Sequence, residues 1–415
     1  KEAFIITVLS WLLLSLLCSV PFIYTSTDLS IVDAIFESMS GLTTTGATTL
    51  NNLNILPKGI LIWRALLQWL GGIGIVVIAL VILPFLRIGG MQIFHLEGDD
   101  PYEKFLPKIS SVVSKIILIY CMLTLILCCL YYFSGMSFFD SLAHSFTTIS
   151  TGGFSNYNES FAYFNSNSIL IISIIFMIIG SFPFLIIAQI NFKNMLIIFK
   201  DHQVRVYLFI LIISVFIIFL FAEKNLFNSQ IDKLVSISFN TVSIISGTGY
   251  ITDNFENWGN HASVLFLILM FIGGCAGSTT GGLKVFRFQI LFKYIALHLK
   301  KMLQPHAVLV ANFNGKKIPD STYDSVMSFF FLYILTFSIS ALLLSFTGLD
   351  FLTCISAAAS SISNVGPGLG ETIGPYGNYS TLTGSSKSIL IATMFLGRLE
   401  MLTIIVIFLP TFWRK

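Results

Sequence analysis

Charge is what this sequence has least of, because only 10% of its 415 residues are Asp, Glu, Lys or Arg, while 55% are hydrophobic. Soluble domains carry about 25% charged residues, so this composition excludes a soluble chain. The mean hydropathy is +0.87. Several apolar runs exceed about 18 residues, which is enough to cross a hydrocarbon core of roughly 30 Å. We therefore expect a helical protein that crosses the membrane many times.

Cysteine is also scarce, and the six cysteines lie in apolar runs without the spacing of metal ligands. We interpret them as packing residues. The apolar spans contain neither a cluster of Asp and Glu nor a pair of histidines. An intramembrane enzyme would need such a convergent set of acids, bases or metal ligands. We therefore expect no enzymatic activity and no cofactor bound by this chain.

One uncharged, threonine-rich stretch, 43–48, interrupts the apolar pattern, and three related glycine-bearing stretches follow it at 150–153, 247–250 and 364–367. Each follows a segment that is too short and too polar to span a membrane but that suits a half-helix. Each also lies between two long apolar spans. The repeating unit is therefore span, half-helix, loop and span, and it recurs four times at a period of roughly 100 residues.

The expected domains are four repeats and three linkers. The repeats cover 1–87, 110–191, 204–300 and 322–415, and the linkers cover 88–109, 192–203 and 301–321. The expected spans are 4–24, 60–86, 112–133, 169–190, 204–221, a span that begins near 262, 325–346 and 388–412. The expected half-helices are 31–40, 138–147, 231–243 and 350–361.

Charge placement indicates the orientation. Most Lys and Arg residues lie in the linkers or at the end of the chain, which places the linkers in the cytoplasm and the glycine loops outside. The loop-bearing side has an excess of Asp and Glu, which would concentrate cations at a pore mouth. A merely solvated acidic face is an equal alternative at this stage.

The four loops favour a pore lining. Non-helical backbone is tolerated inside a membrane only where it is buried in protein or lines water. A half-helix presents the negative end of its dipole to a cation at its C-terminus, and glycine can adopt the positive φ that a ladder of carbonyls needs. Glycines that serve only helix packing would account for the spans but not for four half-helices. We expect an all-α polytopic membrane protein whose four repeats surround a central pore.

These residues resemble the Trk/Ktr/HKT superfamily of potassium transporters, and four motifs are similar to its TrkH branch. The motifs are Ser40–Thr48, Thr148–Phe154, Ser246–Tyr250 and Asn364–Gly370. The resemblance covers essentially the whole chain. It implies a potassium-channel-like pseudo-fourfold fold and potassium uptake across the bacterial inner membrane. It also implies a homodimer with a cytosolic, TrkA-like nucleotide-binding ring, and membrane lipid but no nucleic acid as a further partner.

The resemblance also implies one filter glycine in each repeat. The matching positions are Gly46, Gly152, Gly249 and Gly366, with Gly153 and Gly247 as rivals in repeats 2 and 3. The potassium-binding filter residues that it implies are Thr44, Thr45, Gly46, Ser150, Thr151, Gly152, Gly247, Thr248, Gly249, Asn364, Val365 and Gly366. Members of the branch usually carry an extra helix pair before repeat 1. Because the chain begins with Lys1 and lacks that pair, we expect that an N-terminal piece precedes it.

Five glycines fall within the ten residues of Gly273–Gly282, and each costs a helix about 0.5–1 kcal/mol relative to alanine. We expect the helix to break there, although a helix-packing face is an alternative. The resemblance implies that this segment is a gate loop below the filter. The implied gate residues are Gly273, Gly274, Gly277, Ser278, Thr279, Thr280, Gly281, Gly282 and Arg398.

Arg398 lies about eleven residues into the last span, where an unpartnered charge costs on the order of 3 kcal/mol. We expect it to face the pore beside the gate loop, where the resemblance implies a barrier. A snorkelling or ion-paired arginine is the alternative, but Glu400 lies on a different helix face. We expect Lys284 and Arg287 near the inner mouth and interpret His144 as structural.

Two questions stay open on the sequence alone. A sodium-permeable pathway, or an ion-coupled secondary transporter of a small solute, is the alternative function. Such carriers usually have inverted repeats and intramembrane acids, whereas these repeats are parallel. A symport coupled to protons or sodium is not decided by the residues. The segment 299–319, with Lys300, Lys301, Lys316 and Lys317, is the expected docking surface for a nucleotide-binding partner.

Overall fold

The computed structural model of the chain describes residues 1–25, 29–79, 90, 105–190, 195–223, 226–307, 310–314 and 316–414. Most of the expected linker 88–109 and part of the linker 192–203 lie outside these residues. The expected all-α architecture is confirmed in the described residues, apart from a short antiparallel hairpin of β1 (Asn312–Phe313) and β2 (Lys316–Lys317).

The helices follow one order four times. The first repeat contains α1 (Glu2–Cys18), α2 (Val20–Tyr24), α3 (Ile31–Leu42), η1 (Leu53–Ile55) and α4 (Lys58–Val77). The second contains α6 (Phe105–Phe133), α7 (Phe138–Ile149), η5 (Ser160–Phe164), α8 (Asn167–Gly180), α9 (Phe184–Ile187) and η6 (Met195–Lys200). The third contains α10 (His202–Phe221), α11 (Gln230–Ile245), η8 (Phe255–Trp258), α12 (Asn260–Ile272) and α13 (Val285–Leu303). The fourth contains α14 (Asp320–Ser345), α15 (Phe351–Ser363), η9 (Tyr379–Thr381), α16 (Gly384–Arg398), α17 (Met401–Phe408) and α18 (Pro410–Trp413).

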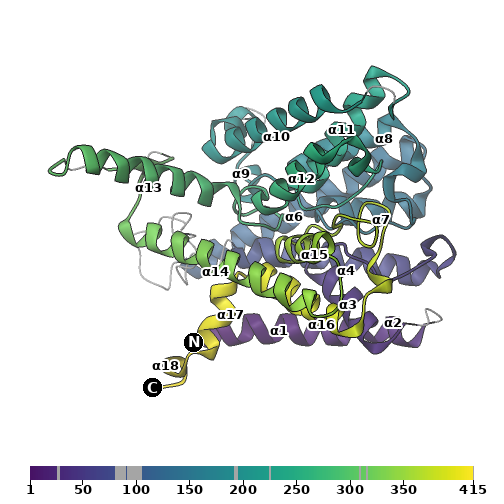
Figure 1. Cartoon of the computed structure of the whole chain (residues 1–415), viewed down its shortest axis with the longest axis horizontal. Helices are drawn as coiled ribbons and strands as arrows, with labels where there is room; N and C mark the ends of the chain where they lie inside the picture. Colours follow the sequence, from purple (N-terminus) through teal and green to yellow (C-terminus); the bar gives the residue numbers. More distant parts are fainter. Residues whose placement is uncertain are drawn as a thin grey trace.

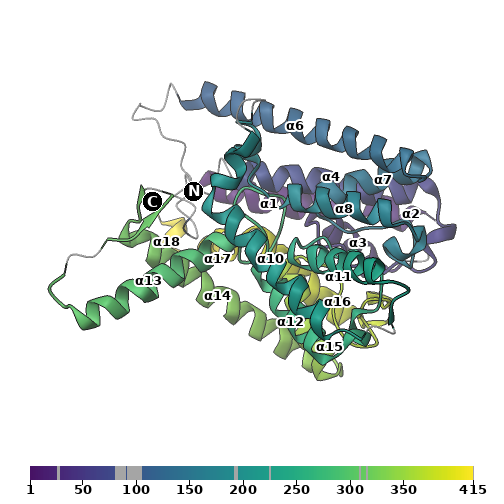
Figure 2. The same cartoon turned by 90° about the horizontal axis from the view of Figure 1, so that it is seen from above.

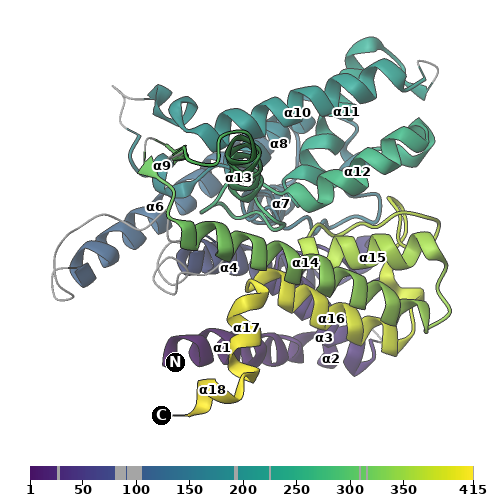
Figure 3. The ribbon, with the colours of Figure 1, turned by 60° about the vertical axis from the view of Figure 1, so that its left-hand side comes forward.

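The repeats close into a ring. In each repeat, the long helix that follows the short helix packs on that short helix and on the short helix of the next repeat. The contacts are α4 on α3 and α7, α8 on α7 and α11, α12 on α11 and α15, and α16 on α15 and α3. The purple and yellow ends of the chain therefore lie side by side in Figures 1 and 3. Helix α13 projects away from the helical body in Figures 1 and 2.

Each short helix begins at a polar cap. The side chains of Ser30, Ser137 and Ser229 accept hydrogen bonds from the backbone N–H of the aspartate three residues later, and Asp350 does the same for Thr353. Such caps satisfy N–H groups that the first helical turn leaves unpaired. The aspartates also lie at the positive end of the helix dipole. These helices form the centre of the molecule, and α15 is buried at every residue from Ser356 to Ser363.

The second spans differ from expectation. Five described helices are long and apolar enough to cross a membrane, and the pair α16 and α17 could form a sixth span, although it bends by 106°. The prediction of continuous spans at 169–190 and 388–412 was wrong. Helix α8 ends at Gly180, three residues before Pro183, which cannot donate a backbone hydrogen bond. Helix α16 ends where Glu400 adopts a φ of +57°, outside the helical region.

The predicted break in the third repeat is present, since α12 ends at Ile272 and α13 begins at Val285. The broken segments of repeats 2 and 3 pair through their backbones. Cys275 donates to the Ser181 carbonyl at 3.0 Å, and Phe184 donates to the Gly277 carbonyl at 3.0 Å. These bonds satisfy peptide groups that the broken helices leave free. By contrast, α4 runs unbroken from Lys58 to Val77.

Candidate functional site

The four short helices end in the same backbone motif. Within two residues of each helix end, a residue adopts a positive φ: Thr44 at +52°, Thr151 at +50°, Gly247 at +71° and Asn364 at +55°. The N–H of the following residue then bonds to the carbonyl five residues earlier at 2.8–2.9 Å, in the pairs Thr45 to Ser40, Gly152 to Thr147, Thr248 to Ser243 and Val365 to Ser360. This Schellman geometry ends a helix and turns the chain sharply.

A second positive φ follows two residues later in every loop. It occurs at Gly46 (+84°), Gly153 (+85°), Gly249 (+79°) and Gly366 (+107°). The common backbone pattern therefore aligns Gly153, rather than its neighbour Gly152, with the glycines of the other three loops. In the third loop it aligns Gly249, because Gly247 occupies the position of the first turn residue.

The four glycines touch one another's loops in a closed circle. A Cβ atom added to Gly46 would lie 2.3 Å from the Gly152 carbonyl oxygen, and one added to Gly153 would lie 1.7 Å from that of Thr248. A Cβ on Gly249 would lie 2.1 Å from the Val365 oxygen, and one on Gly366 would lie 2.7 Å from the Thr45 oxygen. No side chain fits at these distances, so close approach and positive φ both require glycine. We call this arrangement of Gly46, Gly153, Gly249 and Gly366 with the four carbonyls the glycine ring.

A cavity of about 80 Å³ lies against the glycine ring and is lined by all four of its glycines. Neither Gly152 nor Gly247 lines it. In the part of the chain that the structure describes, no group of three or more His, Cys, Asp or Glu could hold a metal ion. The oxygens that meet the four ring glycines are backbone carbonyls, which suit a hard cation that is bound weakly enough to leave.

Side chains tie the loops together. Asn364 donates to the Thr45 hydroxyl at 2.9 Å and to the Met394 carbonyl at 3.1 Å, so it joins repeats 4 and 1. Tyr379 donates to the carbonyl of the ring residue Gly366 at 2.8 Å. The Thr151 hydroxyl lies 3.1 Å from that of Thr279, which belongs to the broken segment of the third repeat. All twelve residues expected at the filter lie in the four loops.

The segment 273–282 packs directly against these loops. A Cβ on Gly281 would lie 2.1 Å from the Ser363 carbonyl oxygen, which precedes the fourth loop. The Thr279 hydroxyl donates to the Gly180 carbonyl at 3.1 Å, at the break in the second repeat. Ser278 and Thr280 bond to each other at 2.8 Å inside the segment. The segment therefore bridges repeats 2, 3 and 4.

Comparison with known proteins decides the family. The sequence profile of TrkH, described as a cation transport protein, matches residues 1–415. The chain belongs to the TrkH family. This confirms the resemblance and places the chain among cation transport proteins rather than enzymes.

Individual relatives agree with this assignment. The Trk system potassium uptake protein TrkI of Halomonas elongata is 39% identical over all of this chain and 84% of its own length. The Trk system potassium uptake protein TrkH of Escherichia coli K12 is 39% identical over all of this chain and 86% of its own. The crystal structure of the potassium transporter TrkH from Vibrio parahaemolyticus matches with a TM-score of 0.89 at 38% identity, over 99% of this chain and 85% of that one.

Positive charge surrounds the 273–282 segment of this TrkH-family chain. Arg398 is buried and donates to the Thr279 carbonyl at 3.0 Å, so it lies beside the segment as expected. Among the described residues, its Nε and Nη1 atoms have no hydrogen-bond partner. Lys284 donates to the Thr280 carbonyl at 2.9 Å. A cation passing here would meet the positive charge of Arg398.

The inner charges include one buried ion pair that the sequence did not predict. Arg287 at the start of α13 pairs with Glu400, which lies at the bend between α16 and α17, at 2.6 Å. Arg287 also lies with its guanidinium 3.7 Å from the centre of the Phe329 ring. Glu400 is therefore a partner of Arg287 rather than of Arg398. The two residues are 113 positions apart, so no local pattern signals the pair.

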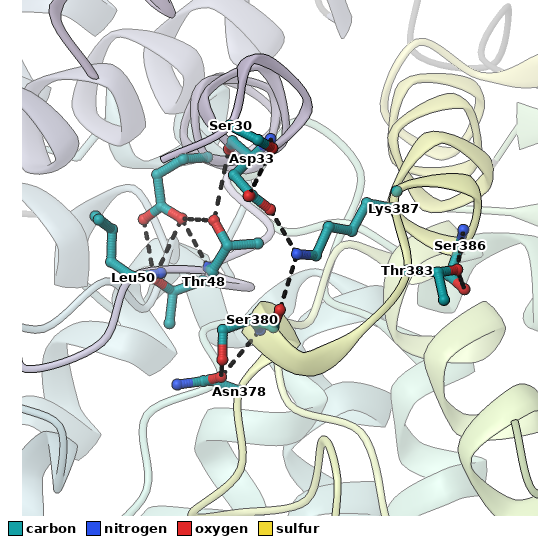
Figure 4. Close-up of polar contacts among 12 residues, drawn as sticks. Ser30, Asp33, Thr48, Leu50, Asn378, Ser380, Thr383, Ser386 and Lys387 are labelled. Atoms are coloured by element: carbon teal, nitrogen blue, oxygen red, sulfur yellow. Dashed lines mark hydrogen bonds and ion pairs between the residues drawn. The ribbon is translucent and has the colours of Figure 1, made fainter. Parts of the chain in front are cut away.

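The outer acidic residues are partly neutralised. Lys387 of α16 reaches Asp33 of α3 at 2.5 Å and donates to the Ser380 carbonyl at 2.9 Å (Figure 4). Glu37 is fully buried and pairs with Arg64 at 2.7 Å. The two residues therefore add no exposed charge to the loop-bearing face. A glutamate inside a half-helix and an arginine inside the next span were the available signal.

Proposed function

We propose that this chain carries potassium ions across a bacterial inner membrane, with the glycine ring as its selectivity filter. The observation that carries the proposal is the closed circle in which each ring glycine admits a carbonyl of the next repeat. Backbone carbonyls arranged around one axis can replace the hydration shell of an ion. Four helix C-termini point their partial negative charge at the same place. The relatives named above are potassium uptake proteins.

The 273–282 segment and Arg398 form the gate in this proposal. The segment lies against the loops that build the ring, and Arg398 holds it through the Thr279 carbonyl. A fixed charge beside the path opposes a cation until the segment moves. Uptake then requires displacement of the segment, whereas selectivity is set at the ring. The mouth of the ring faces outside and the charged linkers face the cytoplasm.

A partner controls the gate in this proposal. The relatives' names refer to a Trk system, which implies other components. We assign a homodimer and a cytosolic nucleotide-binding ring to that system, with 299–319 as the docking segment. Lys300 and Lys301 are exposed at the end of α13, which projects from the helical body (Figure 1). Measuring flux from the purified native complex with and without ATP or ADP tests this assignment.

The decisive experiment is cation flux into liposomes that contain the purified chain. We expect rubidium and potassium to enter faster than sodium, with no requirement for a solute. Empty liposomes and liposomes with a Gly249→Ala variant are the controls. Equal sodium and potassium flux would favour a sodium-permeable pathway, and flux that needs an added solute would favour a coupled carrier. Either result would overturn the proposal.

A further inference from the structure

Behind the glycine ring, each short helix holds the chain that leaves its own loop. In the first three repeats, the side chain that bonds to the departing chain lies seven positions before the first positive-φ residue. These side chains are Glu37, His144 and Asn240. The imidazole of His144 bonds to the Ser155 hydroxyl at 3.0 Å, and the Asn240 amide donates to the Thr252 hydroxyl at 2.6 Å. In the fourth repeat, Ser356 accepts from the Leu369 N–H at 2.9 Å. The group that holds the departing chain is therefore an imidazole in repeat 2, an amide in repeat 3 and a hydroxyl in repeat 4.

The first repeat uses a carboxylate instead. Glu37 accepts hydrogen bonds from the Thr48 hydroxyl at 3.0 Å and from the Thr49 N–H at 3.0 Å, in the chain that leaves the ring. Its side chain is 0% exposed, and that of its partner Arg64 is 1% exposed. Burying two charges is unfavourable unless good geometry and further hydrogen bonds offset the loss of water. The hydrogen bonds from Thr48 and Thr49 provide part of this offset for Glu37.

Arg64 connects this pair to the second repeat. Its Nη1 donates to the Ser155 carbonyl at 3.1 Å, and its Nη2 donates to the Thr48 hydroxyl at 3.2 Å. Its guanidinium also lies 4.0 Å from the centre of the Phe154 ring. Only the planar fork of arginine can make these contacts together, because a lysine ammonium is a compact point charge. Arg64 thus fixes the chains that leave the ring in repeats 1 and 2.

Gln68 lies one turn further along α4, on the same face. Its Nε2 donates to the Gly152 carbonyl at 2.6 Å, and its Oε1 accepts from the Phe154 N–H at 3.0 Å. One side-chain amide therefore holds the peptide groups on both sides of the ring residue Gly153. A Cβ on Gly152 would lie 2.4 Å from the Gln68 Cδ atom, so Gly152 makes room for Gln68 while Gly153 serves the ring.

We propose that Glu37 of α3 and Arg64 and Gln68 of α4 are positioning residues that set cation selectivity without touching the ion. We call these three residues the α4 brace. The proposal rests on the glycine ring acting as the filter. The brace fixes the Gly152 carbonyl, which faces Gly46 in the circle of loops. If these hydrogen bonds are lost, the peptide groups on both sides of Gly153 can move and the ring can widen. A widened ring would then discriminate less well between potassium and sodium.

The test measures the potassium-to-sodium flux ratio of liposomes that contain Gln68→Leu, Gln68→Glu or Arg64→Lys. We expect Gln68→Leu to lower the ratio by at least about fivefold, because it removes two hydrogen bonds and the loss of one ordinary hydrogen bond corresponds to about that factor. Gln68→Glu keeps the shape of the side chain but loses the donor to the Gly152 carbonyl, so it should lower the ratio as well. Arg64→Lys keeps a charge beside Glu37 but loses the contacts to Ser155 and Phe154, and it should also lower the ratio.

Two matched variants separate positioning from general damage. Gln203 is another buried glutamine, and its Oε1 accepts from the Ala276 N–H at 2.9 Å in the gate segment. Gln203→Leu should alter the amount of flux but not the ratio. Asp33→Asn removes an ion pair between repeats 1 and 4 that lies away from the ring, so its ratio should be that of the wild type.

The ratio does not depend on how much protein folds, so reduced yield alone does not decide the outcome. If the wild type prefers potassium but all three brace variants keep its ratio, the brace proposal is wrong and the filter proposal stands. If the wild type itself shows no preference, the filter proposal fails first. A lowered ratio in Gln203→Leu equal to that of Gln68→Leu would also overturn the brace as a selectivity device.

Discussion

In their outer halves the four repeats use one construction, whereas in their inner halves they differ from one another. The outer halves share a capped short helix, a Schellman turn and a glycine at positive φ. Below the ring, α4 is continuous to Val77 and α8 stops before Pro183. Helix α12 gives way to the 273–282 segment, and α16 bends by 106° into α17.

The proposed function accounts for this difference. A site on a common axis needs four equivalent carbonyls, so each repeat must place its glycine in the same way. A gate needs only one obstruction, and one segment contributed by one repeat suffices. The helices around that segment must then leave room for it, which the breaks at Gly180 and Glu400 do. In the proposed function, symmetry is therefore retained at the ring that binds the ion and lost at the gate.

The largest effect should come from breaking the outer symmetry at Gly153. In Gly153→Ala, the new Cβ would lie 1.7 Å from the Thr248 carbonyl oxygen, at a φ of +85° that a side chain disfavours. Strain of this kind costs on the order of 1–3 kcal/mol before the clash is added. We expect loss of potassium-selective flux in liposomes and loss of growth at low potassium in cells that depend on this chain.

Gly152→Ala and Gly59→Ala are the controls for Gly153→Ala. Gly152→Ala meets the side chain of Gln68, which can give way in part, so it should retain some selective flux. No atom of the described residues lies within 4 Å of a Cβ added to Gly59, so Gly59→Ala should behave like the wild type. If Gly152→Ala abolished selectivity and Gly153→Ala preserved it, the backbone alignment of the four loops would not identify the filter glycines.

The next effect concerns the inner half. Removal of 277–279 takes away the Thr279 carbonyl that Arg398 holds and shortens the segment that crosses below the ring. We expect basal flux to rise by about tenfold or more, because a barrier of about 1.4 kcal/mol corresponds to a factor of ten. The potassium-to-sodium ratio should stay that of the wild type. Unchanged basal flux would show that the segment does not obstruct the path.

A smaller effect is expected from Arg398→Ala. At an effective dielectric constant of about 20, two like charges 4 Å apart repel by about 4 kcal/mol. Arg398 lies beside the segment rather than replacing it, so only part of this repulsion acts on an ion in the path. Unregulated potassium flux should increase by less than in the deletion, again without a change in selectivity. Wild-type flux in this variant would contradict a role in the barrier.

Composition and the recurring glycine loops were enough to predict the class of protein, the four short helices and the helix break at 273–282. The choice between Gly152 and Gly153 could not be made from the sequence, because both positions require glycine for different reasons. Gly152 makes room for the side chain of Gln68, and Gly153 adopts the positive φ of the glycine ring. That distinction depends on a side chain 84 positions away.

The other errors have similar causes. Pro183 was a visible signal for the break in α8 that the apolar pattern concealed. The bend at Glu400 has no proline, and the structure supplies an ion pair to Arg287 across 113 positions. The pairing of Arg64 with Glu37 has no local signal either, because Glu37 lies on a different helix, 27 positions earlier. Local patterns predicted the four short helices, whereas buried ion pairs depend on packing between distant helices.

The smallest predicted effect tests whether the outer half acts as one unit with the ring. Ser229→Ala removes the cap of α11, whose hydroxyl accepts from the Asp232 N–H at 3.1 Å. Losing such a cap costs about 1 kcal/mol. In a chain of this size we expect the apparent melting temperature to fall by only about 1–2 °C. The cap is about three turns further from the ring than Asn240, and Asn240 still holds Thr252. The potassium-to-sodium ratio should therefore remain unchanged. If the ratio fell together with the melting temperature, the position of the whole short helix, rather than the braces behind the ring, would control selectivity.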